Sequence, residues 1–355
     1  MENFQLLVNS DVLKHTTFHV KPWLEAFENP QRIQYTLDYL RNVSMLGYVI
    51  KTVKRSATSI DLMKVHSPFL IELIIELNDI GTGEIGENAF ASENLLKSIL
   101  AAVGTAFEAV DRVMQNKTRH AFAMIRPPGH HASYSNAMGL CFVNNMALTV
   151  NYLNEKYNLG RIAIIDIDDH FGNGTSEMFY TDPDVLYISL HEYDLSAPWA
   201  GGIDEIGFGA GEGTNINIPL AEQSNGDDYI KAIDSIVLPI LKRFDPEIVL
   251  VSAGFDGHYL DPVGNLCLTS QTYYEFAKRI NEFVKSIKYK KTIWLLEGGY
   301  NPFAMGCSIE AIITALENKR YKPLPDLFSS IPKKYQKTQH NNRVLFELKD
   351  LHNLT

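Results

Sequence analysis

Asp166, Asp168 and His170 alternate with other residues directly after the apolar run 162–165. In an extended chain these three side chains point to the same side, so two carboxylates and an imidazole would converge beyond the end of a strand. Such a group can hold a divalent metal. A solvated acidic turn is the alternative interpretation, but these polar groups are costly to pack against an apolar strand unless they are paired or bind a metal.

A further acidic residue, Asp256, follows a second apolar run, 247–252. By itself it would be interpreted as a loop or capping residue. If the two strands are neighbours, Asp256 could complete an Asp-His-Asp metal site with Asp168 and His170, because the carboxyl ends of parallel strands meet at one edge of a sheet.

Two adjacent histidines, His130 and His131, follow the apolar run 121–125 and a Pro-Pro-Gly turn. A single histidine is more often structural, but a tandem pair on a rigid turn at a sheet edge suggests proton transfer. Tyr300 follows the run 292–296 and a Glu-Gly-Gly segment, where paired glycines would let the backbone turn tightly and present a phenol.

Short apolar runs that alternate with amphipathic stretches must position these residues. The runs predict buried strands at 121–125, 161–165, 185–190, 247–252 and 292–296. Helices are predicted at 93–115, 144–157, 227–244, 270–287 and 302–318. This alternation predicts an α/β fold with an open, mostly parallel sheet flanked by helices, and nothing forces two domains. Long surface loops are expected at 78–88 and 196–213.

The composition narrows the classes of function. Hydrophobic residues make up 45% of the 355 residues, as in an ordinary globular protein, and the net charge of -10 disfavours nucleic acid and anionic lipid as partners. The three cysteines form no CxxC pair, so neither a disulfide framework nor a thiolate zinc site is indicated. No apolar run approaches the length of a membrane span or a signal peptide, and we expect a cytoplasmic protein.

The sequence resembles the histone deacetylase and acetylpolyamine amidohydrolase superfamily over roughly 27–316. The motifs of the resemblance are Arg126-Pro127-Pro128-Gly129-His130-His131-Ala132, Gly139-Leu140-Cys141-Phe142-Val143-Asn144-Asn145, 166–175, Ser189-Leu190-His191, Gly254-Phe255-Asp256 with Asp261-Pro262, and Glu297-Gly298-Gly299-Tyr300. The last two forms look most like the class II deacetylases and their bacterial homologues. The resemblance implies a single-domain arginase-deacetylase fold.

The resemblance also implies one zinc ion per chain, bound by Asp168, His170 and Asp256, with positions left open for water and for the amide carbonyl of an acylated lysine or polyamine. This would be an enzyme that hydrolyses linear amides.

Each further catalytic role follows from the resemblance. His130, oriented by Asp166, would act as general base on the water, and His131, matched with Asn173, would protonate the leaving amine or stabilise charge there. An acid beside one imidazole and an amide beside the other should push their pKa values apart. Tyr300 would donate its hydroxyl to the developing oxyanion.

Two structural potassium sites are implied as well. The inner site would comprise, in part through backbone carbonyls, Asp166, Asp168, His170, Ser189 and Leu190. The outer site would include Phe179, Asp182 and Val185.

The substrate-binding residues depart from the family pattern. Family members usually hold the acyl chain between two aromatic residues, one of which directly follows the glycine matched by Gly139. This chain has Leu140 there, and Trp199 alone could replace the second wall. The tunnel could therefore be wider and accept larger acyl groups. Val263 stands where polyamine deacetylases have an acidic residue, although Glu84, Glu87 and Asp79 could still form an acidic mouth.

Two other functions compete with a zinc amidohydrolase. An arginase-like ureohydrolase shares the fold but normally uses an Asp-x-His-x-Asp segment for two manganese ions, and Asp-x-Asp-x-His has the wrong order. A non-catalytic module that recognises acylated lysine would have a decayed site, whereas Tyr300 and both histidines are present.

We expect a deacetylase domain over 1–320 and a C-terminal extension, 321–355, that packs on or near it through an amphipathic stretch near 344–351. The same stretch could instead mediate a homo-oligomer.

Overall fold

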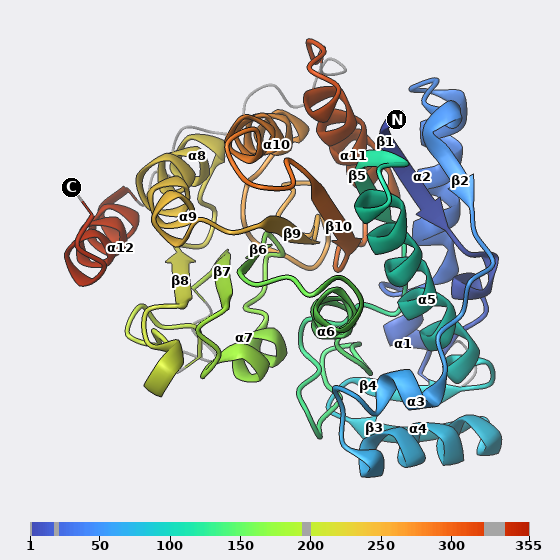
Figure 1. Cartoon of the computed structure of the whole chain (residues 1–355). Helices are drawn as coiled ribbons and strands as arrows, with labels where there is room; N and C mark the ends of the chain where they lie inside the picture. The colour runs from blue at the N-terminus through green and yellow to red at the C-terminus, as the bar shows by residue number, and fades with distance from the viewer. Residues whose placement is uncertain (1, 18–20, 194–199, 323–337, 355) are drawn as a thin grey trace.

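The computed structural model describes residues 2–17, 21–193, 200–322 and 338–354. At its centre lies an eight-stranded sheet in which every neighbouring pair is parallel (Figure 1). From one edge to the other the strands are β2 (Ile50–Thr52), β1 (Glu2–Val8), β5 (Thr118–Ala123), β10 (Thr292–Leu296), β9 (Ile248–Ala253), β6 (Ile162–Asp166), β7 (Val185–Glu192) and β8 (Asn215–Leu220). The predicted α/β class and parallel sheet are confirmed.

Helices cover both faces of the sheet. In chain order they are α1 (Pro22–Glu25), α2 (Pro30–Asn42), α3 (Ser59–Leu62), α4 (Pro68–Ile80), α5 (Leu95–Met114), α6 (Asn145–Tyr157), α7 (Asn173–Phe179), α8 (Gly226–Ala232), α9 (Leu238–Phe244), α10 (Ser270–Val284), α11 (Pro302–Leu316) and α12 (Thr338–Leu351). Helices α5 and α6 pack together on one face, and α2, α11, α10 and α8 form the opposite layer (Figure 1).

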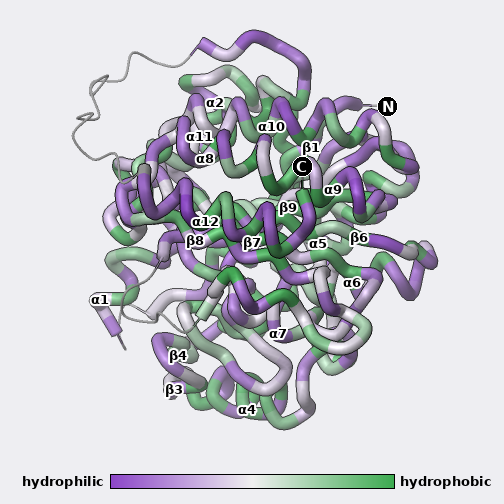
Figure 2. The backbone as a smooth tube through the Cα atoms, turned by 90° about the vertical axis from the view of Figure 1, so that its left-hand side faces the viewer, coloured by the Kyte–Doolittle hydropathy of each residue, from purple (hydrophilic) through white to green (hydrophobic). Residues whose placement is uncertain are grey.

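The central strands are buried along their whole length because a parallel sheet with helices on both faces leaves no face to solvent. All residues of β6, β9 and β10 are buried. Figure 2 shows hydrophobic residues along the central strands, whereas hydrophilic and hydrophobic residues alternate along outer helices such as α12. The apolar side chains of α12 that reach the core are Val344, Leu345 and Leu348.

Several predicted boundaries differ from the structure. The region 78–88 is wrong as a surface loop, because it holds the end of α4 and the strand β3 (Thr82–Gly86), which pairs with β4 (Ala89–Ser92) in an antiparallel hairpin. The helix predicted at 227–244 is α8 and α9 joined by a π-helical turn, Ile233–Val237. Strands β1, β2 and β8 were not predicted.

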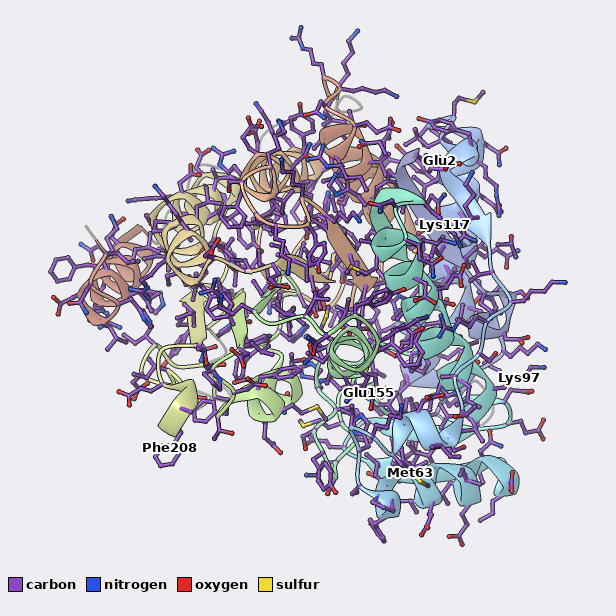
Figure 3. All side chains as sticks on the ribbon, viewed as in Figure 1. Glu2, Met63, Lys97, Lys117, Glu155 and Phe208 are labelled. Atoms are coloured by element: carbon purple, nitrogen blue, oxygen red, sulfur yellow. The ribbon has the colours of Figure 1, made fainter. Side chains whose placement is uncertain are left out.

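Two segments outside the sheet, the loop before β8 and the helix α12, lie at the surface. The loop before β8 is exposed at Phe208, whose ring projects into solvent (Figure 3). The C-terminal helix α12 packs on the edge strand β8, where Asn341 Oδ1 accepts a hydrogen bond from the backbone of Ala221 at 2.8 Å. None of the helices in the described ranges is long and apolar enough to cross a membrane.

The sheet order determines where the polar motifs meet. Strands β5, β10, β9 and β6 are consecutive neighbours, and each is followed by one of the four motifs. The carboxyl ends of these four strands therefore bring the motifs to one edge of the sheet, as open α/β sheets do at their binding sites.

Candidate active site

Asp168, His170 and Asp256 converge beyond the ends of β6 and β9. His170 Nδ1 lies 3.2 Å from Asp168 Oδ1 and 3.2 Å from Asp256 Oδ2, and one ligand atom from each residue lies within 4.8 Å of the others. A tetrahedral zinc ion with bonds of about 2.0–2.1 Å needs its ligand atoms about 3.3 Å apart. The two nitrogen-to-oxygen distances of 3.2 Å therefore fit a zinc ion bound by three side chains, which leaves a coordination position open.

The backbone of the β10 turn approaches these carboxylates closely. Gly298 N donates to Asp168 Oδ2 at 2.8 Å. A Cβ at Gly298 would lie 2.2 Å from Asp256 Oδ2 and 2.6 Å from Asp168 Oδ2, so only glycine fits. The first glycine of the Glu-Gly-Gly-Tyr motif is thus explained by the two buried carboxylates that it contacts.

His130 is buried and paired with an acid. Its Nδ1 lies 3.1 Å from Asp166 Oδ2, and the same oxygen accepts a hydrogen bond from the Tyr187 hydroxyl at 3.0 Å. Burial lowers the pKa of His130, but the carboxylates of Asp168 and Asp166 outweigh burial and raise it to about 10. A cation on Asp168 would offset one of these attractions and lower the pKa toward the range of a general base.

His131 has a different environment. Its Nδ1 lies 2.7 Å from Asn173 Oδ1, and its ring centroid is 4.1 Å from that of His130. Burial, followed by the neighbouring His130 and His170, lowers the pKa of His131 to about 3. The pKa values of the paired histidines therefore diverge, upward for His130 because of its carboxylate neighbours and downward for His131 because of burial and the adjacent imidazoles, although the hydrogen bond to Asn173 acts in the opposite direction.

The Tyr300 phenol lies at the same end of the sheet. Its backbone N–H donates to Asp261 Oδ2 at 2.6 Å, and its ring packs edge-on against Phe27. Burial and then the charge of Asp256 raise the pKa of the Tyr300 hydroxyl well above its usual value. Tyr300 is therefore a hydrogen-bond donor across the physiological pH range.

One predicted tunnel wall lies next to the histidines. Gly139 has a φ of +54°, and a Cβ there would lie 2.6 Å from the His131 ring. The backbone N–H groups of Gly139 and Leu140 donate to the carbonyls of Glu87 and Asn88, at 2.8 and 3.2 Å, so the β3–β4 hairpin borders this wall. Trp199, predicted to form the second wall, lies outside the described residues.

The predicted residue Val263 lies in the loop that also holds Asp261. Its backbone N–H donates to Asp261 Oδ1 at 3.1 Å, while the other oxygen of that carboxylate accepts from Tyr300. Val263 is therefore connected to the Tyr300 turn through a single side chain.

The family of the chain follows from its similarity to known proteins. Residues 26–316 match the family model described as histone deacetylase domain. The chain belongs to the histone deacetylase family. The probable deacetylase of Archaeoglobus fulgidus is 34% identical over 298 residues, which cover 83% of this chain and 81% of that relative. Members of the family are generally zinc-dependent.

Other relatives of this histone deacetylase family member are much longer. Human histone deacetylase 9 is 41% identical over 234 residues, which are 63% of this chain and 23% of the relative. The chain likewise spans 34% of histone deacetylase 6 of Caenorhabditis elegans. The crystal structure of the HDA15 HD domain matches with a TM-score of 0.87 and 26% identity, covering 99% of this chain and 94% of that one.

Sequence reasoning missed the role of Glu297 in this family member. Its buried carboxylate accepts the backbone N–H groups of Gly129 and His130, at 2.6 and 3.1 Å, and burial raises its pKa to about 7. Glu297 thus ties the β10 turn to the histidine turn. The available signal is its position at the start of the Glu-Gly-Gly-Tyr motif, in which the sequence predicts a catalytic role for Tyr300 alone.

His66, for which the sequence suggested no role, supports the loop that begins at the paired histidines. Its Nε2 accepts the backbone N–H of Asn144 at 2.8 Å, and its Nδ1 lies 2.9 Å from the carbonyl oxygen of Ser133. Burial lowers the pKa of His66 to about 4.

His66 should make the protein sensitive to acid. An unfolded chain protonates a histidine near pH ~6.5, whereas folded His66 resists protonation, so its contribution to stability is full above that pH and is lost as the pH falls toward about 4. Within this window one such group changes the free energy of unfolding by about 1.4 kcal/mol per pH unit. We expect His66→Gln, which keeps an acceptor but does not titrate, to have the smaller slope.

Urea unfolding between pH 7.5 and 4.5 measures both slopes. His340→Gln, on α12, is the matched control and should keep the slope of the native protein. Equal slopes for His66→Gln and the native protein would contradict the prediction.

Proposed function

We propose that this protein is a zinc-dependent amide hydrolase that removes acetyl or other acyl groups from lysine side chains of proteins. The observation that supports it best is the convergence of three features at one end of the sheet: the Asp168, His170 and Asp256 cluster, the two histidines with opposite pKa shifts, and Tyr300. Metal-assisted amide hydrolysis needs an electrophile, a base, an acid and an oxyanion donor together.

The Asp168, His170 and Asp256 side chains would hold the zinc ion. When bound, zinc supplies a Lewis acid that polarises the acyl carbonyl and acidifies a water. His130 accepts the proton of that water at Nε2, because its Nδ1 faces Asp166.

The other groups act on the remaining charges of the reaction. His131, whose Nδ1 faces Asn173 and whose pKa is lowered to about 3, would remain neutral and stabilise charge on the leaving amine, and the proton that His130 takes from the water would pass to the amine nitrogen. Tyr300 donates its hydroxyl to the oxyanion that develops from the carbonyl oxygen. Gly298 and Glu297 keep the backbone around these groups in place through the hydrogen bonds described above.

Structural potassium ions belong to the same proposal. For the inner site, the β6–β7 register sets Asp166 beside Ser189, and Leu190 is buried next to it. For the outer site, Phe179, Asp182 and Val185 lie between the end of α7 and the start of β7. Carbonyl oxygens have two lone pairs, so those that already accept a hydrogen bond can still contribute.

The width of the acyl tunnel gives a direct prediction. Because Leu140 stands at the tunnel wall where family members usually have an aromatic residue, we expect the native protein to hydrolyse propionyl- and butyryl-lysine within tenfold of the acetyl substrate. Leu140→Phe should shift the ratio of kcat/KM toward acetyl by about tenfold, since one methylene in an apolar pocket is worth about 10–200-fold.

Steady-state kinetics on matched acyl-lysine peptides measure this ratio. Leu140→Ala should shift it in the opposite direction, and Leu351→Phe, on α12, should leave it unchanged. A native protein that prefers acetyl by more than tenfold would refute the wide tunnel.

Acetylated polyamines are the second candidate substrate, and one observation favours them. The hairpin that carries exposed Glu84 and Glu87 is hydrogen-bonded to the wall at Gly139 and Leu140. Carboxylates at that position would attract a distal ammonium group. An arginase-like reaction has less support, because the described residues contain a single cluster of three metal-ligating side chains.

A three-substrate panel tests the proposal. The zinc-loaded protein is assayed for kcat/KM on acetyl-lysine peptides, acetylated polyamines and arginine. Preference for peptides supports the proposed function, and preference for polyamines makes the acidic hairpin the specificity element. Urea released from arginine, or binding of acylated peptide with no turnover of any substrate, would overturn it.

The division of the chain is also a proposal. Residues 1–320 would form the catalytic domain, and 321–355 an extension that caps the edge of the sheet. The hydrogen bonds of Asn341 to Ala221 and Ser224, at 2.8 and 2.7 Å, support a packed extension.

A further inference from the structure

The C-terminal helix α12 packs on β8, at the opposite edge of the sheet from β2 (Figure 1). Its side chains Val344, Leu345 and Leu348 reach the apolar core and give the helix a hydrophobic contact of its own. Asn341 is nevertheless buried in the same interface, with 2% of its surface exposed. Because a buried amide is costly unless its polar groups have partners, the contacts of Asn341 indicate its role.

Asn341 holds the turn 221–224, which follows β8. Its Oδ1 accepts the backbone N–H of Ala221 at 2.8 Å, and its Nδ2 donates to the Ser224 hydroxyl at 2.7 Å. That hydroxyl donates in its turn to the carbonyl of Ala221 at 2.6 Å. The two polar groups of one amide thus bind both ends of the turn.

The residues of this turn pair with the segment 265–267. Gln223 N donates to the carbonyl of Asn265 at 2.9 Å, and Cys267 N donates to the carbonyl of Ser224 at 2.8 Å. Two backbone hydrogen bonds that run in opposite directions therefore fix the segment relative to the turn.

The other side of the segment is bound by Asp169, which stands between Asp168 and His170. The carboxylate of Asp169 is buried, and it accepts the backbone N–H groups of Asn265 and Leu266, at 2.9 and 3.2 Å. The segment is therefore hydrogen-bonded to the loop 167–170, which we call the metal-ligand loop.

Asp169 also contacts Asp256, the remaining residue of the metal-ligating cluster. Its backbone N–H donates to Asp256 Oδ1 at 2.9 Å. A Cβ at Gly264, just before the segment, would lie 2.3 Å from the carbonyl oxygen of Asp256 and 2.7 Å from Asp169 Cγ. Because the packing leaves so little room, a displacement of the segment would move Asp169 and the groups around it.

We propose that Asn341 is a positioning residue through which the C-terminal helix holds the metal-ligand loop in place. The connection runs through the turn, the segment and the Asp169 carboxylate. Each step is a hydrogen bond between 2.7 and 3.2 Å, and a contiguous network of this kind can couple two separated regions. The inference rests on the proposed function of Asp168, His170 and Asp256 as zinc ligands.

Native-state amide hydrogen exchange on the metal-free protein tests the connection. Asn341→Ala should accelerate exchange at the Asn265 and Leu266 amides by about tenfold or more relative to amides of β9, because the segment opens more easily. The matched control is Asn342→Ala, since Asn342 is exposed on the same helix and accepts a hydrogen bond from Lys231. The control should leave both amides unchanged. Unchanged exchange at both amides in Asn341→Ala would overturn the proposal.

The affinity for zinc gives a readout at the ligands themselves. Loss of a hydrogen bond that orients metal ligands typically costs about 10–100-fold in affinity. Because Asn341 acts through intermediate residues, we expect Asn341→Ala to raise the zinc dissociation constant by about tenfold, at the low end of this range. Asn342→Ala should keep the native value. A change of less than about twofold in Asn341→Ala would contradict the positioning role.

Ser224→Ala separates the connection from the docking of the helix. It removes the hydroxyl that Asn341 binds but keeps every residue of α12. We expect the same faster exchange at the Asn265 and Leu266 amides, with the amides of α12 as protected as in the native protein. In the Asn341→Ala background it should add less than about threefold, because the link is already broken, and a larger addition would refute a shared connection.

Two further outcomes are also decisive. If Asn341→Ala releases α12, seen as faster exchange along the helix, the Ser224→Ala variant decides alone, and unchanged exchange at Asn265 and Leu266 there overturns the proposal. If the native protein binds no zinc while both variants accelerate exchange at these amides, the proposed function fails and the connection from α12 to the metal-ligand loop is supported.

Discussion

Asp256→Asn should abolish tight zinc binding and lower kcat/KM on an acyl-lysine peptide by about 10³ or more, because a metal ion contributes several kcal/mol of transition-state stabilisation. Asp256 Oδ2 lies 3.2 Å from His170 Nδ1, as a shared metal requires, and asparagine keeps the shape but removes the charge. Elemental analysis of the purified variant should find the zinc content far below that of the native protein.

The matched control for Asp256→Asn is Asp350→Asn, an equally conservative change on the exposed side of α12. It should keep the native zinc content and rate. Asp256→Asn protein that retains stoichiometric zinc and more than a tenth of the native kcat/KM would contradict the assignment of this residue as a ligand.

Tyr300→Phe should lower kcat by about 10²–10³-fold and leave KM and zinc content nearly unchanged, because the loss of one oxyanion donor costs this much. The phenol stays protonated, since partial burial and the charge of Asp256 raise its pKa. Removal of the hydroxyl therefore takes away a donor that the native protein holds at every pH used in the assay.

The effect of Tyr300→Phe is read from single-turnover and steady-state rates beside Tyr35→Phe, whose ring is exposed on α2. The control variant should turn over at the native rate. A fall in kcat of less than tenfold for Tyr300→Phe would show that another group stabilises the oxyanion and would remove Tyr300 from the mechanism.

The sequence predicts the central part of the fold well because burial there leaves a strong signal. Strand β10 has the predicted bounds, and β6 and β9 begin one residue later than expected, since a parallel strand covered on both faces is a continuous apolar run. Edge strand β8 reads Asn-Ile-Asn-Ile-Pro-Leu. Its polar residues and its proline are unusual for a buried strand, so the sequence does not distinguish it from the glycine-rich loop that precedes it.

The acidic hairpin was missed for a related reason. Strand β3 reads Thr-Gly-Glu-Ile-Gly, and two glycines in five residues are typical of a loop rather than a strand. Its position is determined by tertiary contact, because Gly86 packs against the carbonyl of Ala137 so closely that a Cβ would overlap with it. No local sequence pattern predicts such a contact.

The residues of the candidate site also differ in how readily the sequence predicts them. Asp166, Asp168, His170 and the two histidines could be proposed from the sequence because they stand together, directly after apolar strands. Asn341 could not be connected with them, since it contacts Ala221 across 120 positions of the chain, and an asparagine in an amphipathic helix is ordinarily a surface residue. Only the fold shows that its amide is buried.

The most direct test of the central claim is a zinc titration of metal-free native protein, followed by the rate of acetyl-lysine peptide hydrolysis. The account predicts no turnover without metal, a linear rise to one equivalent of zinc per chain, and a plateau beyond it. Full activity without metal, or a rise that continues to two equivalents, would contradict a single zinc ion held by Asp168, His170 and Asp256.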